Sequence, residues 1–409
     1  MFSVVHGHRS KNHVRYCGRC RLRISAPRCG GTGYTTESQQ RCLTYRVVLL
    51  DGAKVFIFDS GPLLQIADDV LMSIVLSHST AATLYRSLSG ACPRVPEGWL
   101  VSHSDILDCY PRLDLVRTAR SLLIDRGVLL DAAGSGCADS LRGEPAIDVL
   151  CSVGVRTRAK GVRCHVLGAG LTDDCLIHLG GDVFAASPEL CFLQLAASYD
   201  FVRLVELGFE LCSGYAFQLD GQPVCQRPPI TDVARIRSLI SRLNNRPGNR
   251  IKGTQRALEA LGVVRERTRS PMETAYGMLL VLPTARGGLG LAETRMDYRI
   301  DLTREAARRA RVSHMVCDAF IPSSRLDIEY NGFWHEDQVR QQTDEERRLA
   351  LSSMGVDCIV VTRQGLLSRD GFARHMRALM NKVGLAGLSD DPDFLFRQDC
   401  LRRFVLRNR

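Results

Sequence analysis

Two acidic residues in the last quarter of the chain lie in neighbouring strand patterns that could bring their carboxylates together. Asp318 interrupts an apolar strand pattern, and ten residues separate it from Glu329 in the next such pattern. In a strand, Asp327, Glu329 and Asn331 share one face because side chains alternate. Carboxylates held close together repel unless a cation lies between them, and oxygen ligands suit Mg²⁺ or Mn²⁺. The alternative is a polar sheet face that is exposed to solvent or ion-paired with arginine.

The surrounding patterns predict the elements that position these acids. We expect, in order, a helix over 271–282, strands near 296–301, 315–321 and 325–331, a helix over 336–354, a strand over 356–362 and a helix over 369–382. Gly355 follows a long helical pattern and is a good helix stop, and the apolar, β-branched run after it is typical of a strand. Such an order predicts an α/β fold with a mixed sheet flanked by helices.

These residues resemble the PD-(D/E)xK restriction-endonuclease-like superfamily, and more narrowly the bacterial very-short-patch-repair endonuclease-like proteins. The resemblance covers residues 270–384. It rests on Asp318-x10-Glu329-x-Asn331, on Gly332-Phe333-Trp334-His335, and on the helix with Asp344, Glu345, Arg347, Arg348 and Leu351, followed by Gly355 and the strand 358–361. The resemblance implies a restriction-endonuclease-like C-terminal domain, preceded by a mixed α/β N-terminal domain.

The resemblance also implies roles. Asp318 would be the central metal ligand, Glu329 the second carboxylate, and the Tyr330 carbonyl a further ligand for Mg²⁺ or Mn²⁺. His335 would be a general base or acid, since imidazole changes charge near neutral pH. Glu273 would complete the acid set. The spacing Ser270-x-x-Glu273 is equally that of a helix capping box, so both interpretations of Glu273 remain open.

One departure from the family concerns Asn331, which stands where the signature ends in lysine or another ionisable group. Asparagine can orient water but supplies no charge. Either His335 or a basic residue such as Arg340 takes over the role of the lysine, or the domain is a binding module. Trp334 lies in a region that is near DNA in the repair endonucleases, although it could equally pack under the sheet.

Positive charge is concentrated in two segments of the 409-residue chain. The net charge is +10, while residues 1–50 and residues 227–269 each carry +8. Two basic segments in an otherwise balanced chain favour a polyanionic partner, nucleic acid before membrane. Lys252 and Arg256 are four residues apart, so we expect them on one helix face where they could meet DNA phosphates. The alternative is a solvated basic surface.

Composition shifts suggest how the chain is organised. We expect a basic, disordered tail over 1–46, a mixed α/β domain over 47–225, a basic helical connector over 226–269, an endonuclease-like domain over 270–384 and a C-terminal tail over 385–409. Cys17, Cys20, Cys29 and Cys42 offer a zinc ribbon as the alternative for the first segment. Within the second, 55–58 resembles a strand, apolar residues over 63–75 recur at helical spacing, and Ser187-Pro188-Glu189 begins a helix.

The 16 cysteines are scattered and no export signal accompanies them, which indicates reduced thiols in the cytoplasm. No apolar stretch approaches the ~18 residues of a membrane span. Residues 163–215 resemble domains of abortive-infection-type regulators that precede nuclease-like ends. This gives a hint towards phage defence or toxin–antitoxin biology.

The sequence therefore predicts a metal-dependent DNA endonuclease that hydrolyses phosphodiester bonds in phage defence or DNA repair. The alternative is a catalytically degenerate nucleic-acid-binding regulator of the toxin–antitoxin or abortive-infection type. A third hypothesis is a scaffold that binds a protein partner through residues 47–225.

Overall fold

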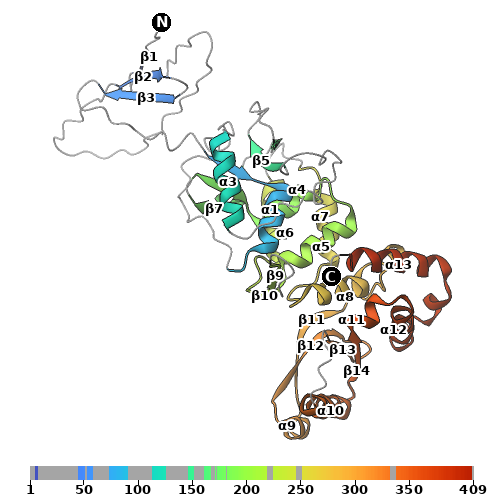
Figure 1. Cartoon of the computed structure of the whole chain (residues 1–409). Coiled ribbons are helices and arrows are strands. Elements are labelled where there is room, and N and C mark those ends of the chain that lie inside the picture. The colour runs from blue at the N-terminus through green and yellow to red at the C-terminus, as the bar shows by residue number, and fades with distance from the viewer. Residues whose placement is uncertain are drawn as a thin grey trace, which may run out of the picture. The chain divides into compact units, whose positions relative to one another are not determined.

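The computed structural model of the chain divides into two units at Met72 and Ser73. It describes residues 5–7, 45–50, 53–58, 73–90, 113–125, 146–151, 161–166, 171, 173–180, 182–218, 224–245, 251–331 and 338–407. In the first unit β1 (Val5–Gly7), β2 (Tyr45–Leu50) and β3 (Ala53–Phe58) form an antiparallel sheet, drawn in blue in Figure 1. The strand expected at 55–58 is confirmed as part of β3.

Most of the predicted N-terminal tail lies outside the described residues. Of residues 1–46, the structure describes only Val5–Gly7 in β1 and the first two residues of β2. The four cysteines of the alternative zinc ribbon are not among them. Both interpretations of this segment therefore stay predictions.

A five-stranded mixed sheet begins the second unit. Its order is β6-β5-β4-β8-β7, from β4 (Ile74–Leu76), β5 (Ile147–Cys151), β6 (Val162–Val166), β7 (Leu176–Gly180) and β8 (Val183–Ala186). β4 pairs parallel with β8 and antiparallel with β5. The expectation of helical spacing is wrong at Ile74 and Val75, since a buried apolar run fits a central strand as well as a helix.

Helices pack on this sheet directly or through one another. They are α1 (His78–Ser87), α3 (Leu113–Asp125), α4 (Pro188–Leu195), α5 (Phe201–Leu211), α6 (Val233–Asn244) and α7 (Thr254–Val263), with a 3-10 turn at Asp173–Cys175 and a short hairpin of β9 (Tyr215–Ala216) and β10 (Cys225–Gln226). Ser187 caps α4 as predicted, because its Oγ accepts a hydrogen bond from Leu190 N at 3.3 Å.

The segment over 226–269 is helical, as predicted, but its helices α6 and α7 pack into the domain and do not form a connector. α6 packs against α4, and α7 packs against α5. The buried side chains Ile236, Leu239 and Leu243 of α6 recur at helical spacing, which makes an apolar stripe facing the core. The charged residues of this segment make the apolar stripe hard to recognise in the sequence.

The C-terminal part is a four-stranded mixed sheet flanked by helices. Its order is β11-β12-β13-β14, from β11 (Arg295–Asp301), β12 (His314–Ile321), β13 (Leu326–Asn331) and β14 (Asp357–Thr362). The first three strands are antiparallel, and β13 and β14 are parallel. The helices are α8 (Pro271–Val281), α9 (Arg304–Ala310), α10 (Gln338–Ser353), α11 (Arg363–Leu367) and α12 (Arg369–Lys382), with a 3-10 turn at Thr284–Arg286. The predicted α/β class with mixed sheets flanked by helices is confirmed at this level.

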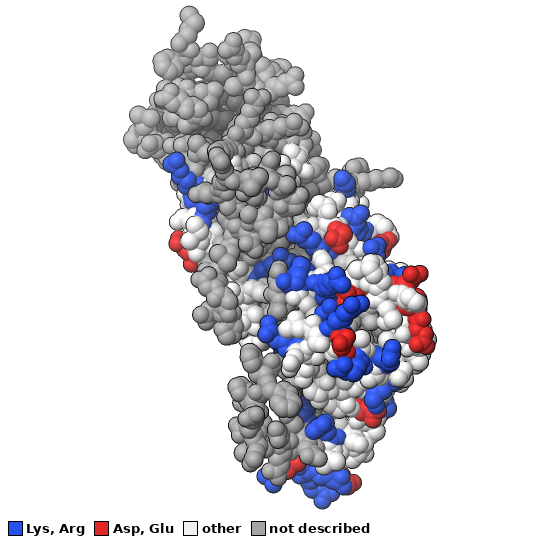
Figure 2. All heavy atoms as spheres, turned by 45° about the vertical axis from the view of Figure 1, so that its right-hand side comes forward, with Lys and Arg blue, Asp and Glu red and all other residues white. Residues whose placement is uncertain are grey.

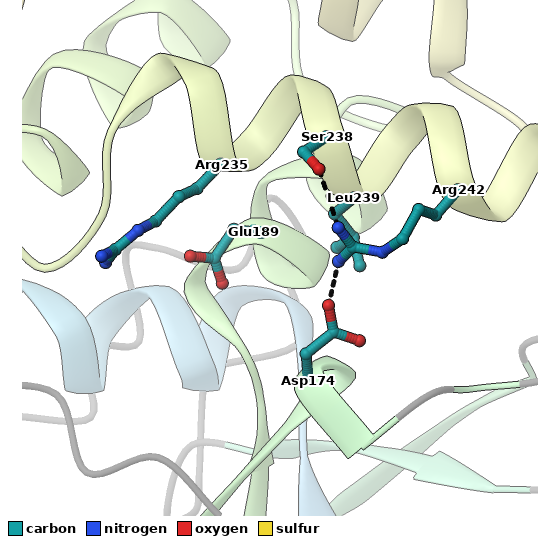
Figure 3. Close-up of a pocket in the computed structure, with 6 residues that line it drawn as sticks. All are labelled: Asp174, Glu189, Arg235, Ser238, Leu239 and Arg242. Carbon is teal, nitrogen blue, oxygen red and sulfur yellow. Dashed lines mark hydrogen bonds and ion pairs between the residues drawn. The ribbon is translucent and has the colours of Figure 1, made fainter. Parts of the chain in front are cut away.

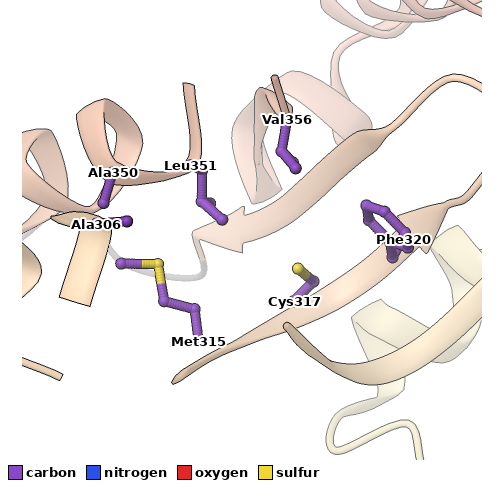
Figure 4. Packing of buried hydrophobic residues seen from close by; sticks show 7 residues of the cluster. All are labelled: Ala306, Met315, Cys317, Phe320, Ala350, Leu351 and Val356. Atoms are coloured by element: carbon purple, nitrogen blue, oxygen red, sulfur yellow. The ribbon is translucent and has the colours of Figure 1, made fainter. Parts of the chain in front are cut away.

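A hydrophobic cluster joins this sheet to α9 and α10. Figure 4 shows Met315, Cys317 and Phe320 of β12 beside Leu351 and Val356. Cys317 and Phe320 are three residues apart, yet both belong to the cluster, so β12 departs from regular alternation between them. Asp318 lies at this irregularity.

The C-terminal residues are not the tail that the sequence suggested. They form a 3-10 turn at Ala386–Asp390 and the helix α13 (Pro392–Val405), which packs against α8. Asp391 caps α13, and Phe394 and Val405 are buried. Arg407 then donates to both carboxylate oxygens of Glu206 in α5, one of them at 3.1 Å.

We expect Arg407→Ala to lower the free energy of unfolding by about 2 kcal/mol, because the carboxylate of Glu206, only 3% exposed, would lose a paired cation. The control is Arg403→Ala, whose exposed pair with Asp399 should contribute less than about 1 kcal/mol. Urea unfolding measures both. Equal losses in the free energy of unfolding would show that the Arg407–Glu206 pair does not stabilise the packing of the C-terminal segment.

Candidate metal centre

The carboxylate of Asp318 lies where the strand pairing stops. The backbone pairs of β12 and β13 run over 319–321 and 326–328, and Asp318 lies just beyond them. Its Oδ2 accepts a hydrogen bond from Tyr330 N at 2.7 Å. The side chain thus takes up a main-chain donor of the neighbouring strand, next to Glu329. Burial raises the pKa of Asp318, the hydrogen bond from Tyr330 opposes this, and the charge of Asp327 adds to it.

Glu273 combines both roles that the sequence left open. Ser270 Oγ accepts from Glu273 N at 3.2 Å, while the Glu273 carboxylate accepts from Arg269 N at 2.7 Å and contacts Ser270 Oγ at 2.9 Å. It therefore caps α8. Burial, and after it the charge of Asp318, raise the pKa of Glu273 to about 7. The same carboxyl group is thus an electrostatic neighbour of Asp318.

Glu329 faces Arg347 of α10. Arg347 Nη2 donates to Glu329 Oε1 and also to the carbonyl oxygen of Val316 at 2.6 Å. Burial, and after it the charge of Asp327, raise the pKa of Glu329 to about 8 despite this arginine, and Asp318 contributes further. Asp327 and Glu329 were predicted to share one face of the strand, which agrees with the effect of the Asp327 charge on the pKa of Glu329.

Glu329 has a second set of neighbours that the sequence did not indicate. Ligand atoms of Cys317, Asp327 and Glu329 lie within 4.8 Å of one another, which is close enough to hold a metal ion. The sequence had instead grouped Asp318, Glu329 and the Tyr330 carbonyl as ligands. Cys317 was missed because a cysteine within an apolar strand is most often a core residue.

Asp318 and Asp327 supply carboxylate oxygens near Glu329, and such oxygens are the ligands that a hard divalent cation such as Mg²⁺ or Mn²⁺ prefers. The shifts of Asp318, Glu273 and Glu329 all have burial as their largest cause and a neighbouring acid as a further one. A bound cation would offset both the cost of burying these negative charges and the repulsion between them. The donor set does not by itself select one metal.

Several predicted site residues cannot be placed. Trp334 and His335 lie outside the described residues, as do the side chains of Asn331 and Arg340, whose backbones belong to β13 and α10. Their expected roles stay predictions.

The expectation for Lys252 and Arg256 is wrong in its geometry. α7 begins at Thr254, after Gly253 at φ 92°, so Lys252 precedes the helix and does not share a helical face with Arg256. A Cβ at Gly253 would meet Ala197 N at 2.6 Å, which explains the break. Arg256 Nη1 donates to the carbonyl of Ala196, the C-cap of α4, at 3.3 Å and to the carbonyl of Tyr199 at 2.9 Å, so this arginine satisfies main-chain acceptors between α4 and α5.

Other arginines of the basic segment border the acids. A pocket of about 500 Å³ is lined by Arg267, Arg269 and Asp297, together with Gly214, Gln226, Arg227 and Pro229. Arg269 Nε pairs with Asp297 Oδ1 at 3.1 Å, and the charge of Asp297 in turn raises the pKa of Asp318 and of Glu273. Arg267 and Asp297 both have a left-handed backbone, at φ 71° and 48°. Strain of this kind is often found at functional sites.

Two of the three arginines on α6 are already matched with acids. Figure 3 shows a separate pocket of about 310 Å³ in which Arg242 reaches Asp174 and Ser238. Arg235, which also lines this pocket, pairs with Asp232 at 3.4 Å. The net charge of residues 227–269 therefore overstates the cations that are free to meet a polyanion.

A cationic surface that the sequence analysis missed lies on α9. Arg304, Arg308 and Arg309 on this helix and Arg311 after it are exposed, and only Glu305 offsets them within the helix. Blue side chains gather at the lower end of the face in Figure 2, the end at which Figure 1 draws α9. Their spacing in Arg304–Ala310 was a signal that could have been read from the sequence.

Comparisons of the chain with models of protein families, with curated proteins and with solved structures give no significant match. Within the described part of the chain, no helix has both the length and the apolar character needed to cross a membrane.

The metal-free protein should lose stability as pH rises from about 4.5 to about 8. A carboxyl group with a pKa of about 8 when folded and about 4.5 when unfolded binds a proton only in the folded state across this interval. Raising the pH therefore removes stability. In Glu329→Gln we expect this loss to be smaller by roughly 1–3 kcal/mol, measured by urea unfolding with chelator present.

The control for this experiment is Glu305→Gln. Glu305 is 68% exposed on α9 and should leave the pH dependence unchanged. An identical pH dependence in wild type and Glu329→Gln would refute the raised pKa of Glu329.

Proposed function

We propose that this chain is a metal-dependent DNA endonuclease whose C-terminal domain has the restriction-endonuclease-like fold. One observation carries the proposal. Glu273, Asp318 and Glu329 come from α8, β12 and β13, and the charge of Asp318 raises the pKa of both of the others. These are the three acids that the family resemblance singles out. Acids that raise one another's pKa in a partly buried place are typical of a cation-binding hydrolytic site.

The cation would be held by Asp318 and Glu329, with the Tyr330 carbonyl as a further ligand. When bound, Mg²⁺ or Mn²⁺ supplies neutralising charge at a phosphate and lowers the pKa of a bound water. Asp318 is oriented for this role by the hydrogen bond from Tyr330 N. Glu273, with a pKa of about 7, can accept or release a proton near neutral pH. It could thus supply the proton transfer that Asn331 cannot.

The DNA backbone would enter past Arg267 and Arg269. Both line the pocket that also contains Asp297, the acid that couples to Asp318 and Glu273. Guanidinium groups bind phosphate through paired N–H donors, and such contacts position a nucleic acid without reading its sequence. The exposed arginines of α9 would add a second, more distant contact with the backbone.

A second candidate is the degenerate nucleic-acid-binding regulator. Arg347 favours it, because a guanidinium already pairs with Glu329 and competes with a metal ion for that carboxylate. Asn331 in place of the signature lysine points the same way. This protein would bind DNA without cutting it, and residues 47–225 would contact a protein partner. Phage defence suits either candidate, and DNA repair suits the nuclease.

Cleavage of supercoiled plasmid in Mg²⁺ and in Mn²⁺ tests the nuclease. We expect Asp318→Asn to reduce nicking at least about 100-fold while DNA binding persists, because the central ligand loses its charge. Asp301→Asn is the control, since Asp301 is 75% exposed on the same sheet. Nicking that survives Asp318→Asn would remove this residue from the mechanism. A folded wild type that binds DNA but does not cut it in either ion would favour the regulator.

Binding of a short DNA duplex tests the entry path. We expect Arg267→Ala to weaken binding by about 3- to 10-fold and to lower the salt dependence by roughly one phosphate contact. Arg403→Ala, an exposed arginine paired with Asp399 on α13, should change neither. If both variants bind as wild type does, DNA does not use this pocket.

A further inference from the structure

Asp327 is a carboxylate without a conventional partner. Its side chain is fully buried, and neither oxygen has a hydrogen-bond partner among the described residues. It lies opposite Phe320 of β12 and beside Cys358 of β14. Burying an ionised carboxylate costs far more than burying an apolar group, so such a group takes up a proton, a cationic partner or a metal ion.

The neighbours of Asp327 suggest which of these applies. The Sγ of Cys317 and a carboxylate oxygen of Glu329 lie within 4.8 Å of a carboxylate oxygen of Asp327 and of each other. Cys317 is fully buried and belongs to the apolar cluster in Figure 4, whereas the Glu329 side chain is 23% exposed. An ion could therefore reach the group past Glu329. The three side chains come from two adjacent strands, which hold them in place.

We propose that Cys317, Asp327 and Glu329 bind a divalent transition-metal ion, with Zn²⁺ as the preferred ion. This set is distinct from Asp318, Glu329 and the Tyr330 carbonyl, which would hold Mg²⁺ or Mn²⁺. A thiolate ligand selects zinc and its chemical relatives over magnesium, and three protein ligands leave one tetrahedral position for water. Ligand atoms around zinc are about 3.5 Å apart, so the group needs to contract by only about 1 Å.

The local charges balance when such an ion is bound. A thiolate and two carboxylates carry three negative charges, and Arg347 supplies one positive charge through its pair with Glu329. A divalent ion supplies the other two. Binding would break the S–H bond of Cys317 and the O–H bond of any protonated carboxyl in the set, with the freed electron pairs going to the metal and the protons to solvent. Without the ion, burial raises the pKa of Cys317 and of Glu329, so these groups hold protons instead.

This inference does not rest on the proposed nuclease activity. Its measurements involve metal and protein alone, so a chain that fails to cut DNA could still bind the ion, and the reverse also holds. The competing interpretation is a core thiol beside a protonated Asp327, with no metal bound.

Cobalt titration of the full chain tests the site. Cys17 and Cys20, outside the described residues, form a CxxC pair that could also bind metal, so every protein tested carries Cys17→Ser and Cys20→Ser. After chelator treatment and dialysis, we expect one Co²⁺ per chain with a thiolate-to-cobalt charge-transfer band. Cys317→Ser should abolish the band, and Asp327→Asn should weaken binding at least 10-fold. Cys400→Ser, which removes an exposed thiol, should leave both unchanged.

X-ray absorption is measured on the zinc-loaded parent protein, which carries only Cys17→Ser and Cys20→Ser. Its result does not depend on whether Cys317→Ser or Asp327→Asn folds. We expect one sulfur and two or three oxygen atoms around zinc. A shell of several sulfurs, a cobalt band that persists in Cys317→Ser, or a folded parent that binds neither ion would overturn the proposal.

Discussion

Burial of ionisable carboxyl groups beside β12 and β13 is the constraint on which the C-terminal sheet depends. Asp327 is fully buried and Glu273 is 9% exposed, and each lies near another acid. Every such group needs a donor, a proton or a cation. Asp318 obtains the N–H of Tyr330, and Glu329 obtains Arg347. The N–H of Tyr330 can reach Asp318 because the pairing of β12 with β13 ends there, at the irregularity in β12. Arg347 reaches Glu329 from α10.

The order of most elements in this half could be predicted from the sequence because local signals were strong, although the helices α9, α11 and α13 were not expected. Ser270 and Pro271 begin α8, and Gly355, at φ 70°, ends the segment that contains α10. The predicted helix over 369–382 agrees with α12, whose cap is Ser368. Capping and helix-stop residues act within a few positions of the chain, so their effect is visible without a tertiary structure.

Partners that depend on distant segments could not be predicted. Arg256 was assigned to DNA, yet its guanidinium donates to the carbonyl of Tyr199, 57 residues away, in the segment between α4 and α5. Cys317 was not among the expected ligands, and it meets Asp327 only because β12 and β13 pair in one particular register. Charge counts failed similarly, since Arg242 is neutralised by Asp174, 68 residues distant. The sequence identifies the acids and bases, whereas pairing among them depends on register and packing.

Glu329 lies at the centre of the functional question because three kinds of positive charge can reach it. Arg347 contacts it already, yet this arginine does not keep its pKa low, since burial and Asp327 raise it to about 8. One guanidinium is therefore insufficient for the acids around it. A regulator could meet the deficit with protons alone, at the cost of stability above neutral pH. A nuclease would use a hard cation shared with Asp318, and the thiol of Cys317 would draw a softer ion to the opposite side. A cation bound only at Asp318 would leave both oxygens of the buried Asp327 without a partner among the described residues. Asp327 therefore distinguishes a metal ion bound at Asp318 from one bound at Cys317.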